Sequence, residues 1–378
     1  MKKILILNPE FPPIGGGASS VSYELAKKIS KKSDFQMDVV TMGYGKLAKF
    51  EKLNNKIQIF RLNCFRKKQS DSRFIEQFIF LILGLLKSFQ LIRKNRYVFC
   101  HCHFFLPTGI IALTNKKILN LDYVISAHGS DVPGYNNERF KLIHKFSKFF
   151  LRQIAKNSRK IIAPSVYLAD LIKKNIGYYK NIVVIANGLI DIAKDKIKKQ
   201  NIILTSSRLV KRKGVQYLIE AFKKIPNKKD WRLFIVGDGH YQEKLISIAS
   251  KEESIFFLGW LDRNKAEYKE IFNKSKIFVF LSQRESQGMV LLEAMSASCA
   301  LISVKNSALK EIIDEKNSIL VKRKAIDQIK NALEKLINNK DLLKKMQKRA
   351  RKRYEQNFQW ENIAFKYLKI YKDLNNDD

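Results

Sequence analysis

Two glutamates, Glu285 and Glu293, lie eight positions apart in the segment RESQGMVLLEAMS (284–296). Paired carboxyl groups are typical of glycosidases, but a retaining glycosidase needs them about 5 Å apart. Eight residues of helix separate two Cα atoms by about 12 Å, so this pair does not fit a nucleophile and an acid. If Glu285 lies in a loop and Glu293 in the first turns of the next helix, each can contact a different part of one extended ligand. The alternative is that Glu293 balances a helix dipole and Glu285 is a surface charge.

Two cations are placed close together in SSRLVKRKG (206–214), where Arg208 follows a predicted strand and Lys213 comes five residues later. Cations at such a strand end can hold a diphosphate and stabilise it as a leaving group. A solvated basic loop explains them equally well, since the chain has 72 Lys and Arg against 35 Asp and Glu. The formal net charge of +37 favours an anionic partner: nucleic acid, an acidic membrane leaflet or a phosphorylated ligand.

Glycines mark a third candidate site. In PPIGGGASS (12–20), Gly15, Gly16 and Gly17 lie between a predicted strand and a helix. Glycines in such a turn let backbone N–H groups approach a phosphate at the positive end of the helix. A tight turn without a ligand gives the same pattern, and the spacing is not that of a dinucleotide fingerprint.

Histidines and cysteines raise the question of a metal. CHCH (100–103) lies on a predicted strand, where neighbouring side chains point to opposite faces, so at most two of the four converge. With no second pair at zinc-like spacing, we expect no metal site. His128, in VISAHGSDV (124–132), follows another strand before a glycine turn, where it either faces a ligand or supports the fold.

The pattern along the chain predicts an α/β scaffold that positions these residues. Short β-branched runs alternate with helical patterns in two series, which predicts two doubly wound parallel sheets. The first series of strands is expected at 3–7, 37–40, 57–62, 97–103, 123–126, 160–165 and 181–187, and the second at 201–207, 232–239, 254–259, 277–282 and 300–304.

The length of 378 residues also favours two domains. We expect a first domain over 1–190, a second over 191–358, and a C-terminal helix at about 359–378 that packs back on the first. The charged segment 191–200 has no apolar period and is the expected linker. Two such domains are expected to face each other across a cleft, with ligands at the carboxyl ends of strands.

The composition of the chain bears on its cellular compartment and on whether it crosses a membrane. Four cysteines do not suit a secreted disulfide scaffold of this size, which favours a reduced, cytoplasmic compartment. The apolar run near the N-terminus is too short for the core of a signal peptide. The apolar segment 77–86 would span about 15 Å as a helix, half of a bilayer core, so we predict that it does not cross a membrane.

The segment RFKLIHKFSKFFLRQIAK (139–156) predicts a basic amphipathic helix. Apolar residues fill one side of it, and the other side carries Lys141, Lys145, Lys148, Arg152 and Lys156. This pattern is expected at an anionic leaflet, and equally for a helix that covers a sheet and exposes its lysines. The first interpretation predicts a protein that docks on the membrane from the cytoplasmic side.

Taken in this order, the motifs resemble those of glycosyltransferase family 4, the retaining, nucleotide-sugar-dependent enzymes with the GT-B fold. The resemblance covers most of the chain: the glycines, HGSD (128–131), Pro164 and Ser165, Asn187 and Gly188, RLVKRKG (208–214), VGDG (236–239), FLG (257–259), the glutamate motif and FQW (358–360). Two residues depart from it, because Ser307 and Ala308 stand where the family usually has glycines.

The resemblance implies a role for each candidate residue. It implies that a donor is bound by Gly15, Gly16, Gly17, Arg208, Lys213, Gly288, Met289 and Glu293. It also implies that Arg208 and Lys213 hold the diphosphate, that Glu285 contacts the transferred sugar, and that His128 faces the reacting sugar. No metal and no cofactor are implied, and the chain has no Asp-x-Asp motif.

The predicted function is therefore the retaining transfer of a sugar from a UDP- or GDP-sugar to a hydroxyl of a glycan or lipid-linked acceptor, in bacterial cell-envelope polysaccharide synthesis. One alternative is a nucleotide-sugar epimerase or hydrolase of the same fold, which would act without an acceptor. Another is a non-catalytic basic module that binds nucleic acid or membrane. Lysines spread over nearly every helix, instead of one strip with aromatic residues, argue against nucleic acid.

Overall fold

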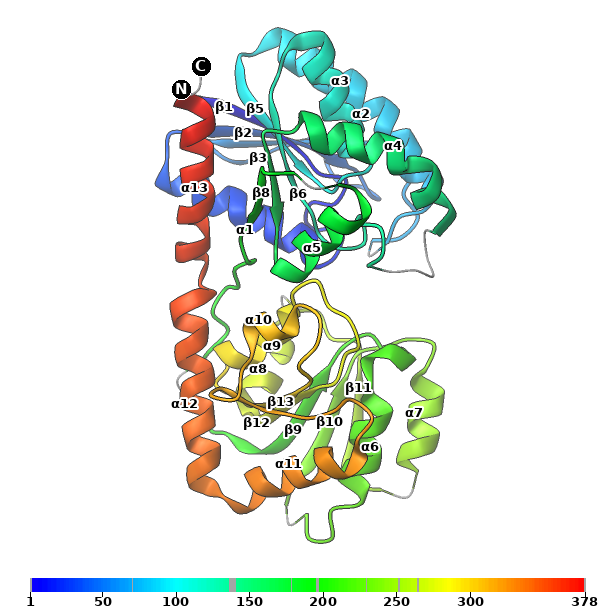
Figure 1. Cartoon of the computed structure of the whole chain (residues 1–378), viewed down its shortest axis with the longest axis vertical. Helices are drawn as coiled ribbons and strands as arrows, with labels where there is room; N and C mark the ends of the chain where they lie inside the picture. The colour runs from blue at the N-terminus through cyan, green and yellow to red at the C-terminus, as the bar shows by residue number, and fades with distance from the viewer. Residues whose placement is uncertain are drawn as a thin grey trace. The chain divides into compact units, whose positions relative to one another are not determined.

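The computed structural model describes residues 2–69, 71–135, 141–177, 179–194, 197–228, 230–250, 252–263 and 265–376, without the side chains of 141–147 and 376. The chain divides into two compact units (Figure 1). Unit 1 comprises Met1–Gly188 and Trp360–Asp378, and unit 2 comprises Leu189–Gln359. Each unit is built around its own sheet.

The sheet of unit 1 has eight strands in the order β3-β4-β2-β1-β5-β6-β7-β8. Their bounds are β1 (Lys3–Leu7), β2 (Gln36–Met42), β3 (Phe50–Asn54), β4 (Ile57–Leu62), β5 (Tyr97–His103), β6 (Tyr123–Ser126), β7 (Lys160–Ala163) and β8 (Ile182–Val184). Neighbouring strands pair in parallel, except that β3 pairs antiparallel with β4. Every predicted strand is present, and the antiparallel edge strand β3 was not predicted.

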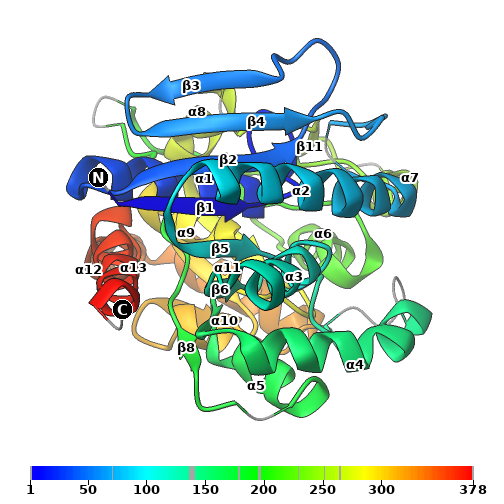
Figure 2. The same cartoon turned by 90° about the horizontal axis from the view of Figure 1, so that it is seen from above.

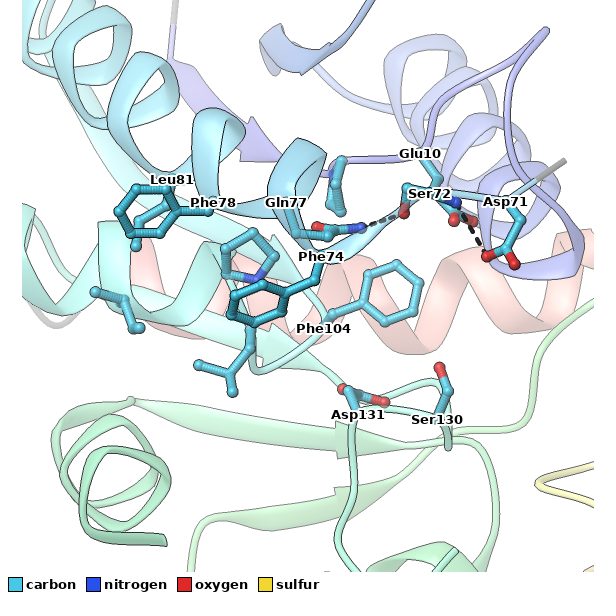
Figure 3. A pocket seen from close by; sticks show the side chains of 14 residues that line it. Glu10, Asp71, Ser72, Phe74, Gln77, Phe78, Leu81, Phe104, Ser130 and Asp131 are labelled. Atoms are coloured by element: carbon cyan, nitrogen blue, oxygen red, sulfur yellow. Dashed lines mark hydrogen bonds between the residues drawn. The ribbon is translucent and has the colours of Figure 1, made fainter. Parts of the chain in front are cut away.

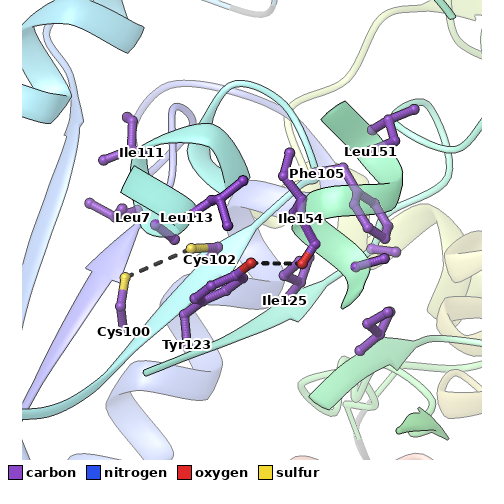
Figure 4. Close-up of a cluster of buried hydrophobic side chains, with 14 of the residues drawn as sticks. Leu7, Cys100, Cys102, Phe105, Ile111, Leu113, Tyr123, Ile125, Leu151 and Ile154 are labelled. Carbon is purple, nitrogen blue, oxygen red and sulfur yellow. Dashed lines mark hydrogen bonds between the residues drawn. The ribbon is translucent and has the colours of Figure 1, made fainter. Parts of the chain in front are cut away.

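Helices cover both faces of this sheet, as Figures 1 and 2 show. Their bounds are α1 (Gly17–Lys32), α2 (Phe74–Lys94), α3 (Thr108–Leu119), α4 (Lys141–Asn157), α5 (Val166–Asn175) and α13 (Trp360–Asn376). Side chains alternate between the two faces of the sheet along β1. Leu5 and Leu7 belong to the buried cluster that the sheet forms with α2 to α5. Ile4 and Ile6 belong to the buried cluster on the other face, which the sheet forms with α1 and α13. Figure 4 shows the first cluster, where the Tyr123 hydroxyl donates to the Ile154 carbonyl at 2.7 Å.

The C-terminal helix α13 is held in unit 1 by polar contacts as well as by its apolar face. Glu361 forms an ion pair with Lys28 of α1. The Tyr371 hydroxyl, fully buried, lies 2.5 Å from Nδ1 of His101 in β5. These contacts explain why a segment that follows the whole of unit 2 in the sequence packs on the sheet of unit 1.

Helix α2 is twice as long as the apolar segment that predicted it. It has 21 residues, about 31 Å at 1.5 Å per residue, so the prediction that it is too short to cross a membrane is wrong in its premise. Among the described residues it is the one helix with the length and apolar composition of a membrane span, and 28% of its most apolar window is buried. One face, with Phe80, Gly84 and Leu91, packs on the unit, and the opposite face is exposed.

The sheet of unit 2 has six strands in the order β11-β10-β9-β12-β13-β14, all paired in parallel. Its strands are β9 (Gln200–Ser206), β10 (Arg232–Val236), β11 (Ile255–Gly259), β12 (Ser275–Phe280), β13 (Ala300–Ser303) and β14 (Ser318–Leu320). Its helices are η1 (Lys211–Lys213), α6 (Val215–Lys223), α7 (Gln242–Ala249), α8 (Ala266–Lys274), α9 (Met289–Ser296), α10 (Leu309–Ile312), α11 (Ile326–Asn338) and α12 (Lys340–Asn357). The two predicted parallel sheets are thus confirmed.

The first residues of the expected linker (191–200) are fixed by contacts within unit 2. The unit boundary falls at Gly188 and Leu189, just before it. Asp191 accepts hydrogen bonds from both terminal nitrogens of Arg351, at 2.7 and 2.5 Å, and from the Ser296 hydroxyl at 3.0 Å. Ile192 is buried. The beginning of this charged segment is therefore part of the packing of unit 2.

Candidate functional site

The candidate site of unit 2 lies where its strand order changes direction. From β9, the chain builds the sheet outward through β10 and β11 on one side and through β12, β13 and β14 on the other. In doubly wound sheets, ligands bind outside the carboxyl ends of strands at such a switch point. Arg208 and Lys213 follow β9, and Glu285 follows β12, its direct neighbour.

The loops that follow β9 and β12 are locked together by their backbones. The Gln283 N–H donates to the Arg212 carbonyl at 3.0 Å, and Arg212 donates from its side chain to the Arg284 carbonyl at 3.3 Å. Gly214 adopts a left-handed φ of 78°, and a Cβ there would lie 2.6 Å from the Leu281 carbonyl oxygen. Only glycine permits this close approach of the two loops.

Lys213 and Glu285 form an ion pair across the two loops. The exposed fractions of their side chains are 11% and 13%, so the pair is largely withdrawn from water. Burial lowers the pKa of Lys213 against the opposing effect of Glu285, and the charges of Arg212 and Arg208 lower it further. The Ser282 hydroxyl donates to the same Glu285 oxygen at 2.5 Å. Glu285 is thus neither a free base nor a surface charge.

Ser307 supports this arrangement, although the family usually has glycine there. Its φ of 42° is left-handed, which explains why glycine suits the position. Its hydroxyl accepts a hydrogen bond from the Glu285 N–H at 3.1 Å. Next to it, the Asn306 amide donates to the Ser282 carbonyl at 3.2 Å, and Ala308 is fully buried. The departure therefore adds a hydrogen bond to the glutamate loop.

Glu293 lies in α9 and is 4% exposed. The Tyr268 hydroxyl of α8 donates to its Oε2 at 2.6 Å, and Nε of Arg263 lies 3.7 Å from its Oε1. The Glu293 charge raises the pKa of Arg263, and burial together with that charge raises the pKa of Tyr268. These contacts contradict the alternative in which Glu293 only balances a helix dipole.

Helix α9 begins between the two glutamates. Its cap residue, Gly288, has a left-handed φ of 88°, and a Cβ there would lie 2.6 Å from a methyl group of Leu309. Because glycine has no side chain, it cannot cap the first N–H groups of the helix, which begin at Met289. Such an N-terminus suits an anionic ligand group.

The glycine loop of unit 1 follows β1 as predicted, but its three glycines are not equivalent. Gly15 has a φ of 94°, and a Cβ there would meet Glu10 at 2.7 Å. A Cβ on Gly16 or Gly17 would meet no heavy atom of the described residues within 4 Å. Of these three glycines, packing within unit 1 therefore requires only Gly15.

His128 is the outer member of a stack of three histidines at the ends of β5 and β6. The rings of His101 and His103 are 4.4 Å apart, those of His103 and His128 are 5.3 Å apart, and Nδ1 of His103 lies 3.0 Å from Nε2 of His128. Burial lowers the pKa of His128 to about 3, so the ring is neutral near pH 7. Asp131 accepts hydrogen bonds from the N–H groups of His128, Gly129 and Phe105 at 2.9 to 3.0 Å, which fixes the loop.

The predicted alternation of CHCH is confirmed. Cys100 and Cys102 lie on one face of the sheet with their sulfur atoms 3.7 Å apart, within the apolar cluster of Figure 4. His101 and His103 lie on the other face, where His101 contacts Tyr371 and the Ser126 hydroxyl at 2.8 Å.

The predicted basic helix is α4, and the side chains of Lys141 and Lys145 lie outside those described. Lys148, Arg152 and Lys156 are exposed, while Leu151 and Ile154 are fully buried. Two phenylalanines on the predicted apolar side are exposed, Phe149 at 65% and Phe150 at 52%.

Sequence reasoning missed several residues that hold the candidate site together. They are Asp131, His103, Arg263, Tyr268, Ser282 and the hydroxyl of Ser307. Arg263 and Tyr268 precede Glu293 by 30 and 25 positions and belong to a different loop and helix. No local spacing in the sequence marks such a contact, because tertiary packing brings the partners together. Ser282, three residues before Glu285 at a strand end, is the one that position alone could have indicated.

Comparison with known proteins identifies the class. Two family models match adjoining parts of the chain: "Glycosyltransferase Family 4" over residues 15–191 and "Glycosyl transferases group 1" over residues 190–353. An uncharacterized glycosyltransferase of Methanocaldococcus jannaschii is 26% identical over 98% of both chains.

Solved structures show the same fold along the whole chain. Sucrose-phosphate synthase from Thermosynechococcus elongatus has a TM-score of 0.83 at 17% identity and covers 100% of both chains. Anabaena HepE in complex with UDP has a TM-score of 0.75 at 15% identity and covers 99% of this chain and 100% of its own. The expected GT-B fold is thus confirmed.

The chain belongs to glycosyltransferase family 4, group 1, and is an enzyme that uses a nucleotide-sugar donor. This assignment contradicts the alternative of a non-catalytic basic module.

Proposed function

We propose that the enzyme transfers a sugar from a UDP-sugar, with retention of configuration, to a hydroxyl of a glycan or lipid-linked acceptor in cell-envelope polysaccharide synthesis. The observation that carries this proposal is the largely buried Lys213–Glu285 ion pair at the switch point of unit 2. The related fold of HepE was solved with UDP, which supports the choice of uridine.

The donor contacts proposed in unit 2 follow its geometry. Arg208 and Lys213 bind the diphosphate, and the uncapped start of α9 at Gly288 and Met289 adds backbone N–H groups. Glu293, held by Tyr268 and Arg263, accepts the ribose hydroxyls. Glu285, held by Lys213 and Ser282, contacts the transferred sugar.

Unit 1 contributes the remaining proposed contacts. The backbone of Gly16 and Gly17 is open to a ligand because no side chain crowds it, and Gly15 shapes the turn. His128, neutral and oriented by His103, contacts the reacting sugar as a hydrogen-bonding group instead of as an acid.

The proposed reaction breaks the bond between the anomeric carbon and the β-phosphate oxygen. The acceptor hydroxyl attacks from the same face, its oxygen forms the new glycosidic bond, and its proton passes to the departing phosphate oxygen. The products are the α-linked or β-linked glycoside, as in the donor, and UDP. Arg208 and Lys213 stabilise the negative charge that develops on the leaving diphosphate.

We further propose that unit 1 docks on an anionic bilayer from the cytoplasmic side. Helices α2, α3 and α4 lie side by side on one face of its sheet, as Figure 2 shows. Exposed apolar side chains on the outer surface of this layer are Phe74, Ile75, Phe78, Ile82, Leu86, Phe149 and Phe150. Phe149 and Phe150 adjoin the exposed Lys148, with Arg152 and Lys156 on the next turns, so apolar and cationic groups occur together.

Vesicle flotation tests the docking. The wild type should float with vesicles containing phosphatidylglycerol at low salt, and less with pure phosphatidylcholine. The double variant Phe149→Ser with Phe150→Ser should float less, while Phe365→Ser, at a 70% exposed position of α13, should behave as the wild type. Failure of the wild type to float at low salt would contradict the proposal.

A thermal-shift panel of UDP, GDP, ADP and their sugar conjugates tests the donor assignment. A ligand that binds only the native state raises Tm by mass action, so UDP compounds should give the largest shift. Glu293→Gln should reduce that shift, whereas Glu270→Gln, on the half-exposed side of α8, should not. A larger shift with GDP or ADP would overturn the choice of uridine. Sugar release from the donor at an equal rate with and without acceptors would identify a hydrolase.

A further inference from the structure

A pocket within unit 1 is lined by both apolar and polar side chains. Its volume is about 320 Å³, within the range of small-molecule sites. It lies between the first turns of α2, the start of α3 and the loops that follow β1, β5 and β6 (Figure 3). All of its lining residues belong to unit 1.

The two ends of this pocket differ in chemistry. Phe78, Leu81, Leu106 and Ile110 give one part an apolar lining. Polar groups gather toward the other end, and these are Glu10, Asp71, Ser72, Ser130 and Asp131. Figure 3 shows Phe78 and Leu81 on one side, with Glu10, Asp71 and Ser72 on the other. Such a lining suits an amphiphile.

The polar end adjoins the two segments of unit 1 that we assign to the reacting sugar. Glu10 contacts Gly15 so closely that a Cβ there would lie 2.7 Å from its own Cβ. Asp131 accepts the N–H groups of His128 and Gly129. A molecule that fills the pocket would therefore place its polar end beside the glycine loop and His128.

The apolar end opens toward an apolar surface. Phe74 and Phe78 line the pocket and are 68% and 50% exposed. Further along the same helix, Ile82 and Leu86 are 47% and 64% exposed. A hydrocarbon chain that leaves the pocket would thus lie on apolar side chains of α2, where its exposure to water is reduced.

We propose that this pocket binds the hydrocarbon part of an amphiphilic acceptor, an alkyl or prenyl chain joined to a hydroxylated sugar head. Glu10 and Asp71 at the polar end can accept hydrogen bonds from hydroxyls, while Asp131 already accepts three backbone N–H groups. Arg66 lies 3.9 Å from Glu10 and offsets part of the charge, and the negative charge that remains disfavours a phosphate. The reacting head is therefore an uncharged sugar, with any phosphate of the acceptor held elsewhere. This inference rests on the proposed function and specifies its acceptor.

Direct binding to the full chain tests the inference without knowledge of the natural acceptor. The probe is dodecyl β-D-glucoside below its micelle concentration, with a photoreactive diazirine at the end of the chain, and methyl β-D-glucoside is the comparison. Only the dodecyl compound should bind, with cross-links in 74–81 and 106–110. Cross-links elsewhere, or equal binding of both compounds, would overturn the inference.

Two variants and one control separate the pocket from unspecific adsorption. Phe78→Glu puts a charge on the apolar wall, and Ile110→Trp fills the space without a charge. Each should weaken probe binding about tenfold or more, because the chain loses contact with an apolar wall. Phe365→Glu, at an exposed position of α13 outside the pocket, should have no effect. Equal binding by all four proteins would mean detergent adsorption and would overturn the inference.

UDP binding in the same samples distinguishes this inference from the proposed function. If UDP binds while the variants leave probe binding unchanged, the pocket assignment fails and the transferase proposal stands. If the wild type does not bind UDP, the proposed donor fails whatever the probe does. An unchanged Tm without ligand shows that each variant is folded.

Discussion

The ion pair between Lys213 and Glu285 permits a test that separates a catalytic role from a structural one. Lys213→Met keeps an unbranched side chain and removes the charge, which leaves the Glu285 carboxylate without its cation. Glu285→Gln removes the opposite charge, and its amide oxygen can still accept the hydrogen bond from Ser282. The two substitutions and their combination form a double-mutant cycle.

The expected loss of stability follows from how deeply the ion pair is buried. Its side chains are 11% and 13% exposed, between an exposed pair, which contributes up to about 1 kcal/mol, and a fully buried pair, whose disruption costs about 3 to 5 kcal/mol. We expect Lys213→Met to lower the free energy of unfolding by about 2 kcal/mol and Glu285→Gln by about 1 kcal/mol. The double variant should lose less than the sum, because neither charge is then left alone.

Turnover should behave differently from stability. If Lys213 stabilises the leaving diphosphate, its loss should reduce kcat about 100-fold or more, the effect of removing one transition-state donor elsewhere. The double variant should regain stability and remain as slow as Lys213→Met, since the diphosphate still lacks its cation. Lys224→Met with Asp327→Asn is a matched control at an exposed pair, at 54% and 79% exposure, that should change neither quantity.

Denaturant unfolding and UDP release with the best donor measure the two quantities on the same samples. Recovery of both stability and turnover in the double variant would refute the catalytic role of Lys213 and leave a structural pair. Loss of turnover in the control pair would show instead that the assay reports general destabilisation.

Three further results are expected. Burial lowers the pKa of His101 to about 3, against about 6.5 in the unfolded chain, so the unfolded chain takes up the proton first as the pH falls. The contribution of His101 to stability is complete above about pH 6.5 and falls by on the order of 2 kcal/mol by about pH 4.5, and His128, whose pKa burial also lowers to about 3, adds a similar slope. His101→Phe should therefore reduce this slope in thermal melts without removing it. Ser307→Ala, which removes the acceptor of the Glu285 N–H, should lower the free energy of unfolding by about 1 kcal/mol in urea titrations, while Ser307→Gly should lower it less because it relieves the left-handed φ. Tyr268→Phe, which removes one hydrogen-bond donor from the buried Glu293, should lower the free energy of unfolding by about 1 to 3 kcal/mol. It should also weaken UDP binding by about three- to tenfold in calorimetry, and unchanged binding would contradict the role given to Glu293.

Much of the scaffold was predictable, because the strands of a buried parallel sheet are short runs rich in β-branched residues. Each predicted strand is present, and the residues that follow β9 and β12 come to adjacent strand ends, because the switch point follows from strand order. The exceptions have local causes. Strand β3, FEKLN, alternates between exposed and half-exposed residues at a sheet edge, so it carries no apolar run. The polar residues within α2 concealed its full length.

The contacts within the candidate site were less predictable, because they depend on side chains far apart in the chain. Tyr268 and Glu293 meet through the packing of α8 and α9, which no spacing encodes. For the glycine loop, in contrast, the sequence suggested more than the packing requires. The sequence did not distinguish the three glycines, yet packing within unit 1 requires glycine at Gly15 and not at Gly16 or Gly17. In the proposed function, the close approach of a donor to the backbone would favour glycine at these two positions.

The geometry also explains why so basic a chain keeps two carboxylates in this motif. Burial and the neighbouring Arg208 and Arg212 lower the pKa of Lys213, and Glu285 opposes that shift. The carboxylate therefore favours the charged form of the ammonium group, and in the proposed reaction a bound diphosphate would replace it as the counter-ion. Glu293 likewise holds Arg263. Each carboxylate thus pairs with a cation, and in the proposed reaction the Lys213 cation would face an anionic leaving group.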